Sequence, residues 1–500
     1  MFKLCPRKSI NHDGNVDSGR WQFLRDAIVY TMEHVFRNSF ADTVRDGWRR
    51  SILRPIHSRQ SSGKEPPMVL QHHFTWQVLF RLTTATAFAC FASSGAMTQE
   101  KDTYLVTEFG ATADDDVLDT QAFQKAIDVA ARHGGTVRVP KGRFITGRLQ
   151  LPSGVRLFLE EGAVLQGSAD FRDYGQGRWT DSFLFAENAE RITIEGPGTI
   201  DGADCEIPGG EEGFRGPHAI RFVRCRNVTI RDVTITRAGN YAVLCNDSED
   251  FLISGVKFRG GHDGVHAQAC RRFRVVDCDF RTGDDCLAGC DNVDFEVARC
   301  QINSSCNGFR LGCVHLRVHD CRFWGPGEYP HRITIKKGKP RTNMLSAFVH
   351  FAPTDRNPKL PSDDWLIQNC TMDTVDAVYL YDFEKGVWQT GQPAKRLAFE
   401  NIRAQNIALP LRVLGDKDRQ FDLTLKNVSI ALRDDRADQP VLDITQFGRL
   451  TLENGVLQNS GKQPVLRARD GREIHLHHVE AKPTNPQPFL WTNVEKVSQD

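Results

Sequence analysis

The 500-residue sequence has no long hydrophobic run. A membrane-spanning bundle needs stretches of about 18 or more apolar residues, so we do not expect a membrane partner. The chain also lacks an excess of charge, since 64 Lys and Arg residues face 63 Asp and Glu residues and the net charge is +1. General nucleic-acid binding depends on a basic excess or stripe, so a nucleic acid is not an expected partner either.

Paired cysteine motifs that hold structural zinc are missing, because no CxxC-like pair is followed by a second one. We therefore expect no metal and no cofactor. Cysteine itself is plentiful: the chain has 14, and 11 of them lie between Cys205 and Cys321.

The N-terminal part differs in composition from the rest. Residues 1–67 are net basic and rich in arginine, and we expect them to be a disordered or untranslated extension. Residues 68–96 begin at a methionine, pass through a mildly apolar stretch of small residues and end in Ser94-Gly95-Ala96, which suits a signal-peptidase site. We therefore expect a signal peptide over 68–96 and a secreted or periplasmic protein, with an ordinary buried helix as the alternative.

The body of the chain repeats with a period near 22 residues. Alternating runs typical of strands occur at 227–235, 250–258, 273–280, 295–302, 316–323 and 365–372. One aligned column reads Val233, Val256, Cys278, Cys300 and Cys321, with steps of 23, 22, 22 and 21 residues. A fixed period with a strand pattern predicts an all-β parallel solenoid. We expect a single domain of about ten coils over 103–480, a tail over 481–500, and mostly free cysteines that fill the core.

One helix is expected before the coils. Residues 119–132 carry apolar residues at helical spacing, and Gly134 and Gly135 follow them. Such a helix would cap the first coil, whose open edge otherwise invites aggregation.

The same register aligns polar residues along one face of the coils. Asp263, Asp285 and Asn307 recur at steps of 22 residues, and we expect them to stack in neighbouring coils. By the same register the column extends to Asn240 on one side and to Glu328 on the other. Turn decoration is the alternative, because Asn and Asp favour turns.

Asp284 beside Asp285 brings three carboxylates, with Asp263, into two neighbouring coils. Like charges this close destabilise a protein unless something requires them. Glycoside hydrolysis needs one carboxylic acid to protonate the leaving oxygen and another carboxylate to activate water or attack carbon. A coil rise of about 4.8 Å with an offset along the strand predicts roughly 6–9 Å between Asp263 and Asp284, which fits the inverting geometry.

Basic and polar side chains are expected to surround these carboxylates. Cations suit an anionic sugar such as a uronate, since arginine can bind its carboxylate through two hydrogen bonds. The residues predicted to contact the substrate are Asn240, His266, Asn307, Arg310, Glu328, His331, Arg332 and Lys336.

At these residues the sequence resembles the polygalacturonase-like glycoside hydrolases of family 28, in the pectin-lyase-like right-handed parallel β-helix group. The likeness covers about residues 103–410, and segments 108–112, 119–127, 135–142 and 151–165 resemble the opening of that fold. Gly283-Asp284-Asp285 matches the family's Gly-Asp-Asp, and Asp263 matches the aspartate of its Asn-Thr-Asp. The resemblance implies that Asp284 is the general acid and that Asp263 and Asp285 hold the attacking water.

Two other motifs of the family are altered. Asn307 stands where the histidine of Gly-His-Gly is expected, and Arg332 with Lys336 is the nearest substitute for Arg-Ile-Lys. The resemblance implies a monomeric hydrolase for an acidic, pectin-type polysaccharide of plant or algal type. The changes put plain polygalacturonan specificity in question.

Two other functions stay open at this point. The first is a polysaccharide lyase that binds Ca²⁺ through the three aspartates, because Ca²⁺ takes oxygen ligands. The second is a solenoid that binds glycans without catalysis.

Overall fold

The computed structural model describes residues 103–383 and 391–500, and these are almost entirely β-structure. The prediction of an all-β chain is therefore confirmed. The expected extension over 1–67 and signal peptide over 68–96 lie outside the described residues. Within the described ranges no helix is long and apolar enough to cross a membrane.

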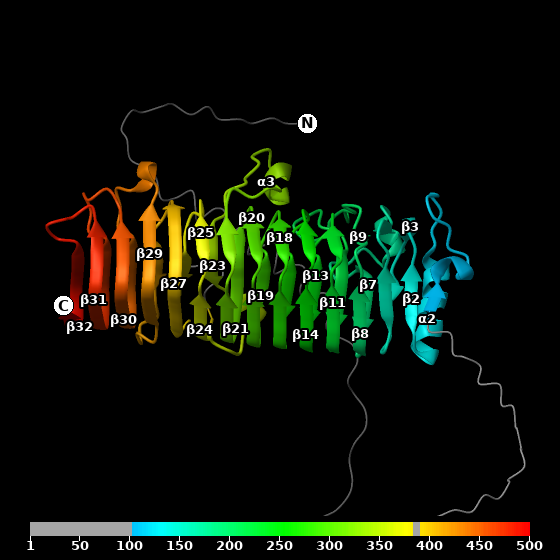
Figure 1. Cartoon of the computed structure of the whole chain (residues 1–500), viewed down its shortest axis with the longest axis horizontal. Helices are drawn as coiled ribbons and strands as arrows, with labels where there is room; N and C mark the ends of the chain where they lie inside the picture. The colour runs from blue at the N-terminus through cyan, green and yellow to red at the C-terminus, as the bar shows by residue number, and fades with distance from the viewer. Residues whose placement is uncertain (1–102, 384–390) are drawn as a thin grey trace, which may run out of the picture. The chain divides into compact units, whose positions relative to one another are not determined.

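The strands pair in parallel and form three ladders (Figure 1). The first ladder consists of β1 (Thr103–Leu105), β2 (Thr136–Val139), β5 (Arg156–Leu159), β8 (Glu190–Glu195), β11 (Arg226–Arg231), β14 (Glu249–Ser254), β17 (Arg271–Val276), β19 (Leu287–Ala298), β21 (Asn307–His319), β24 (Asp363–Gln368), β27 (Arg396–Ile407), β29 (Asp422–Leu432), β30 (Leu442–Gln458), β31 (Leu466–Lys482) and β32 (Phe489–Gln499).

The second and third ladders take one strand or part of a long strand from each turn of the chain. The second consists of β3 (Gly142–Thr146), β6 (Ala163–Gly167), β9 (Thr199–Asp201), β12 (Thr234–Thr236), β15 (Lys257–Arg259), β18 (Asp279–Thr282), β20 (Gln301–Ser304), β22 (Arg322–Trp324), β25 (Thr371–Asp373) and the later parts of β27, β29, β30 and β31. The third consists of β4 (Leu149–Gln150), β7 (Ser182–Glu187), β10 (His218–Val223), β13 (Val243–Asn246), β16 (Val265–Gln268), the first parts of β19 and β21, β23 (Ser346–His350), β26 (Tyr379–Asp382), β28 (Leu411–Leu414) and the first parts of β30, β31 and β32.

Strand register follows the period read from the sequence. Phe251 pairs with Phe273, and Phe273 pairs with Phe295, so equivalent repeat positions lie side by side. The ladders continue beyond the expected end, because β32 pairs with β31 as far as the pair Leu476 and Gln499. Residues 481–500 are therefore not a tail: their proline-rich stretch forms the turn between two paired strands.

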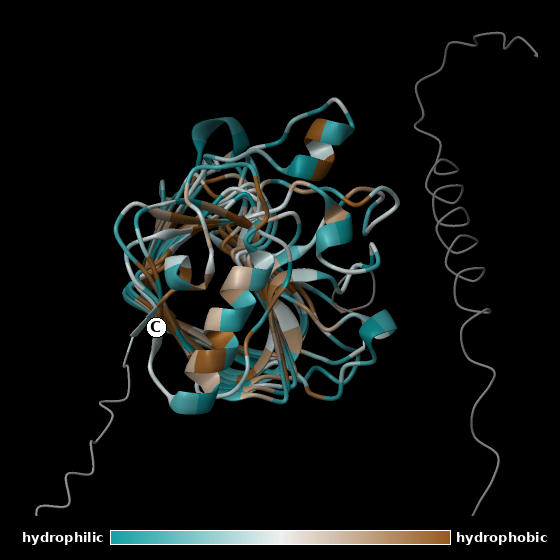
Figure 2. Ribbon diagram, turned by 90° about the vertical axis from the view of Figure 1, so that its right-hand side faces the viewer, coloured by the Kyte–Doolittle hydropathy of each residue, from teal (hydrophilic) through white to brown (hydrophobic). Residues whose placement is uncertain are grey.

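The core consists of stacked columns of equivalent side chains. Phe273 lies between Phe251 and Phe295, with ring centroids 5.0 and 4.7 Å apart. The twelve cysteines in the described ranges are all buried and free, which agrees with their expected role as small apolar core residues. An end-on view shows the hydrophobic residues gathered mainly on the strands and the hydrophilic residues mainly on the surrounding loops (Figure 2).

Few helices interrupt the strands. The expected first helix is α2 (Thr120–His133), whose buried face includes Phe123, and this ring meets Phe144 of β3 at 5.7 Å. Because α2 packs on β1, β2, β3 and β4, it covers apolar side chains of the first coils. The remaining helical segments are α3 (Arg332–Lys336), η2 (Val106–Phe109), η3 (Phe171–Asp173), η4 (Thr354–Arg356) and η5 (Asp434–Arg436).

Removing one ring from the aromatic column tests the contribution of the stacking. We expect Phe273→Ala to lower the stability of the coils by about 3–5 kcal/mol, because it leaves a cavity between two rings. Arg274→Ala is the matched control: its side chain is exposed and pairs with Glu296, and exposed ion pairs contribute only about 0–1 kcal/mol. Thermal unfolding of both variants is the measurement, and equal melting temperatures would contradict the prediction.

Candidate active site

The third ladder carries a cleft of about 420 Å³ at the start of its central strands. Asp263 lies just before β16, and Asp285 lies just before β19. The Gly264 amide donates to the Asp285 carbonyl at 2.9 Å, and the Cys286 amide donates to the Asn307 carbonyl at 3.0 Å. Asp263, Asp285 and Asn307 therefore occupy equivalent positions in three successive coils, as the 22-residue register predicts.

The three aspartates converge in this cleft. One oxygen of each of Asp263, Asp284 and Asp285 lies within 4.8 Å of the other two, and all three residues are buried. The nearest oxygens are thus closer than the separation expected from the coil rise, because the side chains turn toward one another. Such a group of buried carboxylates requires protons or cations to balance its charge.

Arg310 and Asn307 bind the Asp285 side of the group. The Arg310 guanidinium donates to Asp285 Oδ2 and lies 3.6 Å from Asp263 Oδ2. The Asn307 side-chain amide donates to Asp285 Oδ1 at 2.7 Å, while its oxygen accepts from the Ser346 hydroxyl at 2.8 Å. Asn307 therefore positions Asp285.

Arg215 binds the Asp284 side, and sequence reasoning missed it. Its guanidinium donates to Asp284 Oδ2 at 2.8 Å and to Asn240 Oδ1 at 3.3 Å, and it pairs with Glu212 at 2.6 Å. Glu211 in the same loop accepts from the Asn240 amide at 2.9 Å. This loop joins β9 to β10 outside the repeat, so the coil register held no signal for it.

Burial and neighbouring charge separate the proton affinities of the aspartates. Burial and then the charge of Asp284 raise the pKa of Asp263 to about 7. Burial also raises the pKa of Asp285, against the opposing effect of Arg310. Asp263 therefore keeps its proton to a higher pH than an exposed aspartate does.

Asp284 behaves in the opposite way. Burial alone would raise its pKa, but a hydrogen bond with His331 and the charge of Arg215 hold the pKa well below its usual range. His331 Nε2 lies 3.5 Å from Asp284 Oδ2. Asp284 is therefore ionised in the ligand-free cleft.

His266 lies behind the carboxylates. Its Nδ1 is 2.9 Å from Asp263 Oδ2, and its fully buried ring stacks on Tyr241 at 4.5 Å. His266 is thus placed to orient Asp263.

The register also corrects the ends of the expected polar column. Val243 pairs with Val265, so Tyr241 lies level with Asp263, and Asn240 is offset by one residue. At the other end Asn307 pairs with Ser346, so Ser346 takes the position in the column that the period had assigned to Glu328.

The expected place of Glu328 in that column is wrong. The loop between β22 and β23 carries Glu328 to the surface, where Arg281 binds it at 2.7 and 2.8 Å. Arg332 and Lys336 lie in the same loop and pair with Glu206 at 3.2 and 2.8 Å. In this state these three side chains bind other protein groups and do not touch the aspartates.

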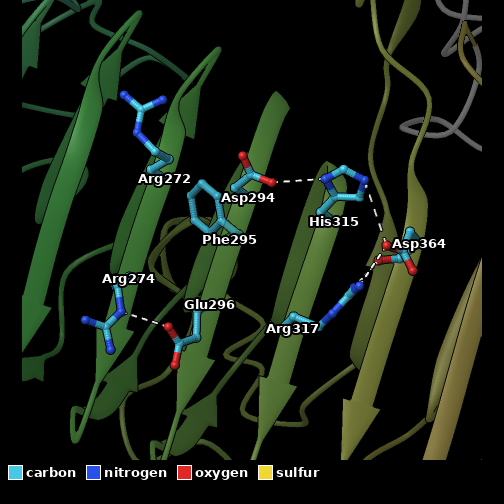
Figure 3. A pocket seen from close by; sticks show the side chains of 8 residues that line it. All are labelled: Arg272, Arg274, Asp294, Phe295, Glu296, His315, Arg317 and Asp364. Atoms are coloured by element: carbon cyan, nitrogen blue, oxygen red, sulfur yellow. Dashed lines mark hydrogen bonds and ion pairs between the residues drawn. The ribbon is translucent and has the colours of Figure 1, made fainter. Parts of the chain in front are cut away.

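A second groove lies on the first ladder (Figure 3). It is lined by charged side chains that pair with one another, including Arg274 with Glu296 at 2.7 Å and Arg317 with Asp364 at 2.7 Å. His315 Nδ1 is 3.0 Å from Asp294. This self-paired surface lacks the converging buried carboxylates of the cleft on the third ladder.

An infrared pH titration tests the proton on Asp263. We expect the carbonyl band of a protonated carboxylic acid to disappear as pH rises through about 7, because burial and the charge of Asp284 favour the neutral acid below that pH. Asp263→Asn should remove this transition. Asp277→Asn, at an exposed residue paired with Arg299, should keep it, and a transition that survives Asp263→Asn would contradict the prediction.

The three aspartates of the cleft lie within a segment that is similar to known proteins, whereas part of the cleft lining, from His331 to Arg356, lies beyond it. The family model described as "Glycosyl hydrolases family 28" matches residues 131–314, which include the three aspartates. A probable polygalacturonase of Vitis vinifera is 28% identical over 232 residues, which are 41% of this chain and 45% of that protein. An endo-polygalacturonase of Pectobacterium carotovorum subsp. carotovorum is 24% identical over 246 residues, covering 42% and 59%.

The chain spans about half the length of the curated relatives it matches. Among solved structures, the family 28 exopolygalacturonase of Yersinia enterocolitica aligns with a TM-score of 0.51 at 17% identity, over 80% of this chain and 78% of that chain. At this identity the structural likeness concerns the fold. The family match and the sequence relatives show that residues 131–314 are similar to glycosyl hydrolases of family 28 and to polygalacturonases.

Proposed function

We propose that the protein hydrolyses glycosidic bonds in an acidic, pectin-type polysaccharide. The observation that carries this proposal is the convergence of Asp263, Asp284 and Asp285 in one buried cleft. Hydrolysis of a glycoside needs a proton donor and a carboxylate that activates water. Asp263 favours the protonated form and Asp284 the ionised form, so the three aspartates supply a proton donor as well as a carboxylate.

Basic side chains around the cleft favour an anionic sugar. Arg215, Arg310, Lys337, Arg341 and Arg356 line it together with the aspartates. A uronate carboxylate can accept two parallel hydrogen bonds from one guanidinium. The negative charge of such a substrate would then balance the positive charge of these side chains.

Asp284 is our choice for the general acid, with Asp263 and Asp285 as the holders of water, as the Gly-Asp-Asp match implies. The geometry of the cleft opposes this assignment, because a hydrogen bond with His331 and the charge of Arg215 keep Asp284 ionised, while burial favours a proton on Asp263. We infer that an anionic sugar draws Arg215 away from Asp284. If the sugar also displaces the hydrogen bond with His331, burial raises the pKa of Asp284, and the proton moves to it from Asp263 within the group.

A Ca²⁺-dependent lyase is the alternative, in which the cation would compete with two arginines for the carboxylates. Arg215 and Arg310 donate hydrogen bonds to the oxygens of Asp284 and Asp285 that Ca²⁺ would need as ligands. We further propose that the strand ladders form a right-handed parallel β-helix. The same proposal makes the protein a secreted or periplasmic monomer. Inversion of the anomeric centre stays a prediction, because the nearest oxygens of Asp263 and Asp284 lie closer together than the coil rise suggested.

Product analysis on polygalacturonate, rhamnogalacturonan and neutral glycans tests the function. We expect new reducing ends from an acidic glycan, without the ultraviolet absorbance of an unsaturated uronate and without sensitivity to EDTA. Asp284→Asn should lower the rate about 10²–10⁴-fold, because it removes acid–base catalysis. Asp294→Asn, on the groove of the first ladder, should change it little. Unsaturated products that vanish with EDTA would identify a lyase instead.

Aryl uronides separate the acid from the water-holding groups. A good leaving group needs no proton, so Asp284→Asn should recover at least about tenfold of its lost activity on an activated aryl uronide relative to the polymer. Asp263→Asn should recover none. Recovery in Asp263→Asn and not in Asp284→Asn would assign the acid to Asp263.

A further inference from the structure

Asp284 belongs to a second cluster beside the carboxylates. One donor atom from each of Asp284, Cys306 and His331 lies within 4.8 Å of the other two. All three residues are more than nine-tenths buried, and all three line the cleft. The cluster thus presents one oxygen, one sulfur and one nitrogen donor toward a single point that the cleft reaches.

Buried ring nitrogens at this cluster lack partners. In the part of the chain that the structure describes, Nδ1 of His331 has no hydrogen-bond partner, although the side chain is buried. Both ring nitrogens of the neighbouring His262, which meets Phe214 at 5.7 Å, are likewise unpartnered among the described residues. Buried polar atoms without a partner cost free energy and call for an explanation. Nε2 of His331 is the nitrogen that meets Asp284, at 3.5 Å, so it is the one placed to bind a ligand beside Asp284.

The donor set indicates the kind of ligand. Thiolate and imidazole bind Zn²⁺ and similar transition metals, whereas Ca²⁺ and Mg²⁺ prefer oxygen ligands alone. Three protein ligands with the fourth position open to a cleft also match the usual form of a reactive zinc site. Zinc bonds of roughly 2.0–2.3 Å would draw the three donors somewhat closer together. Asp284 and Cys306 lie in the short turns before β19 and β21, whereas His331 lies in the longer loop between β22 and β23.

We propose that Asp284, Cys306 and His331 bind a thiophilic divalent cation such as Zn²⁺ and that the bound cation blocks the cleft. On binding, the Cys306 thiol releases one proton to solvent and its sulfur forms a bond to the metal. Asp284 and neutral His331 donate electron pairs to the same ion. The block of hydrolysis rests on the proposed function, because it consists in withholding Asp284 from the sugar, whereas the binding itself does not.

Arg215 competes with the cation for Asp284. Its guanidinium already donates to Asp284 Oδ2 at 2.8 Å, so the metal must displace it or use the other oxygen, which accepts from the Asp285 amide at 3.2 Å. Burial and then the charges of Asp285 and Asp284 raise the pKa of the Cys306 thiol well above its usual value, against Arg341 and Arg310, so metal binding must offset the cost of deprotonating this thiol. The site is therefore expected to bind metal reversibly, and Arg215→Gln should bind it more tightly than the native protein.

Cobalt provides a test that needs no substrate. Co²⁺ added to the reduced full-length protein should produce a sulfur-to-cobalt charge-transfer band, and Zn²⁺ should remove it. Cys306→Ser should abolish the band. Cys313→Ser, at another buried free cysteine, should keep it. Absence of the band from the native protein, or its survival in Cys306→Ser, would overturn the proposal.

A second variant guards against misfolding of the first. His331→Gln should weaken Zn²⁺ binding at least about tenfold, as measured by competition with a chromogenic chelator, with an unchanged melting temperature in the absence of metal. An unchanged Zn²⁺ affinity would count against the site.

If cobalt binds as expected but Zn²⁺ leaves glycan hydrolysis unchanged, the block is wrong while the site stands. If no glycan is cleaved at all, the proposed function fails and the cobalt result still decides the metal site.

Discussion

Parallel pairing of strands at equivalent repeat positions is the constraint on which the rest of this structure depends. Each turn of chain places the same repeat position directly beside its neighbour, so whatever stands at one position forms a column. Apolar positions become stacked phenylalanines such as Phe251, Phe273 and Phe295. The same geometry brings Asp263 and Asp285 together, and only opposite charge or a proton makes that column tolerable.

The compensation for this charge comes from two places in the chain. Arg310 lies in β21, the strand that pairs with β19 next to Asp285, and it binds Asp285. Arg215 comes from a loop outside the repeat and binds Asp284. Burial and the charge of Asp284 favour a proton on Asp263, while His331 and Arg215 keep Asp284 ionised, so the three carboxyls have an ionised side and a protonated side. That division is what acid–base chemistry on a sugar requires.

The altered family motifs acquire a physical meaning in this setting. Asn307 replaces the expected histidine and joins Asp285 to Ser346 by hydrogen bonds. A neutral amide in that position adds no charge to an already crowded cleft. Imidazoles are present nevertheless: His266 contacts Asp263, and His331 contacts Asp284. Imidazole nitrogens therefore lie beside the carboxylates of the cleft, but they come from positions other than the one where the family has its histidine.

The sequence by itself determined the strand content, the 22-residue register, the first helix and the three aspartates, because each depends on spacing within or between adjacent repeats. Only the tertiary structure decided which loop residues meet those aspartates. Arg215 reaches Asp284 across 69 residues of chain, while Glu328, which the spacing placed in the column, pairs with Arg281 on the surface. A loop that leaves the ladders is no longer bound to their period, and its path is set by packing and ion pairs that spacing does not encode.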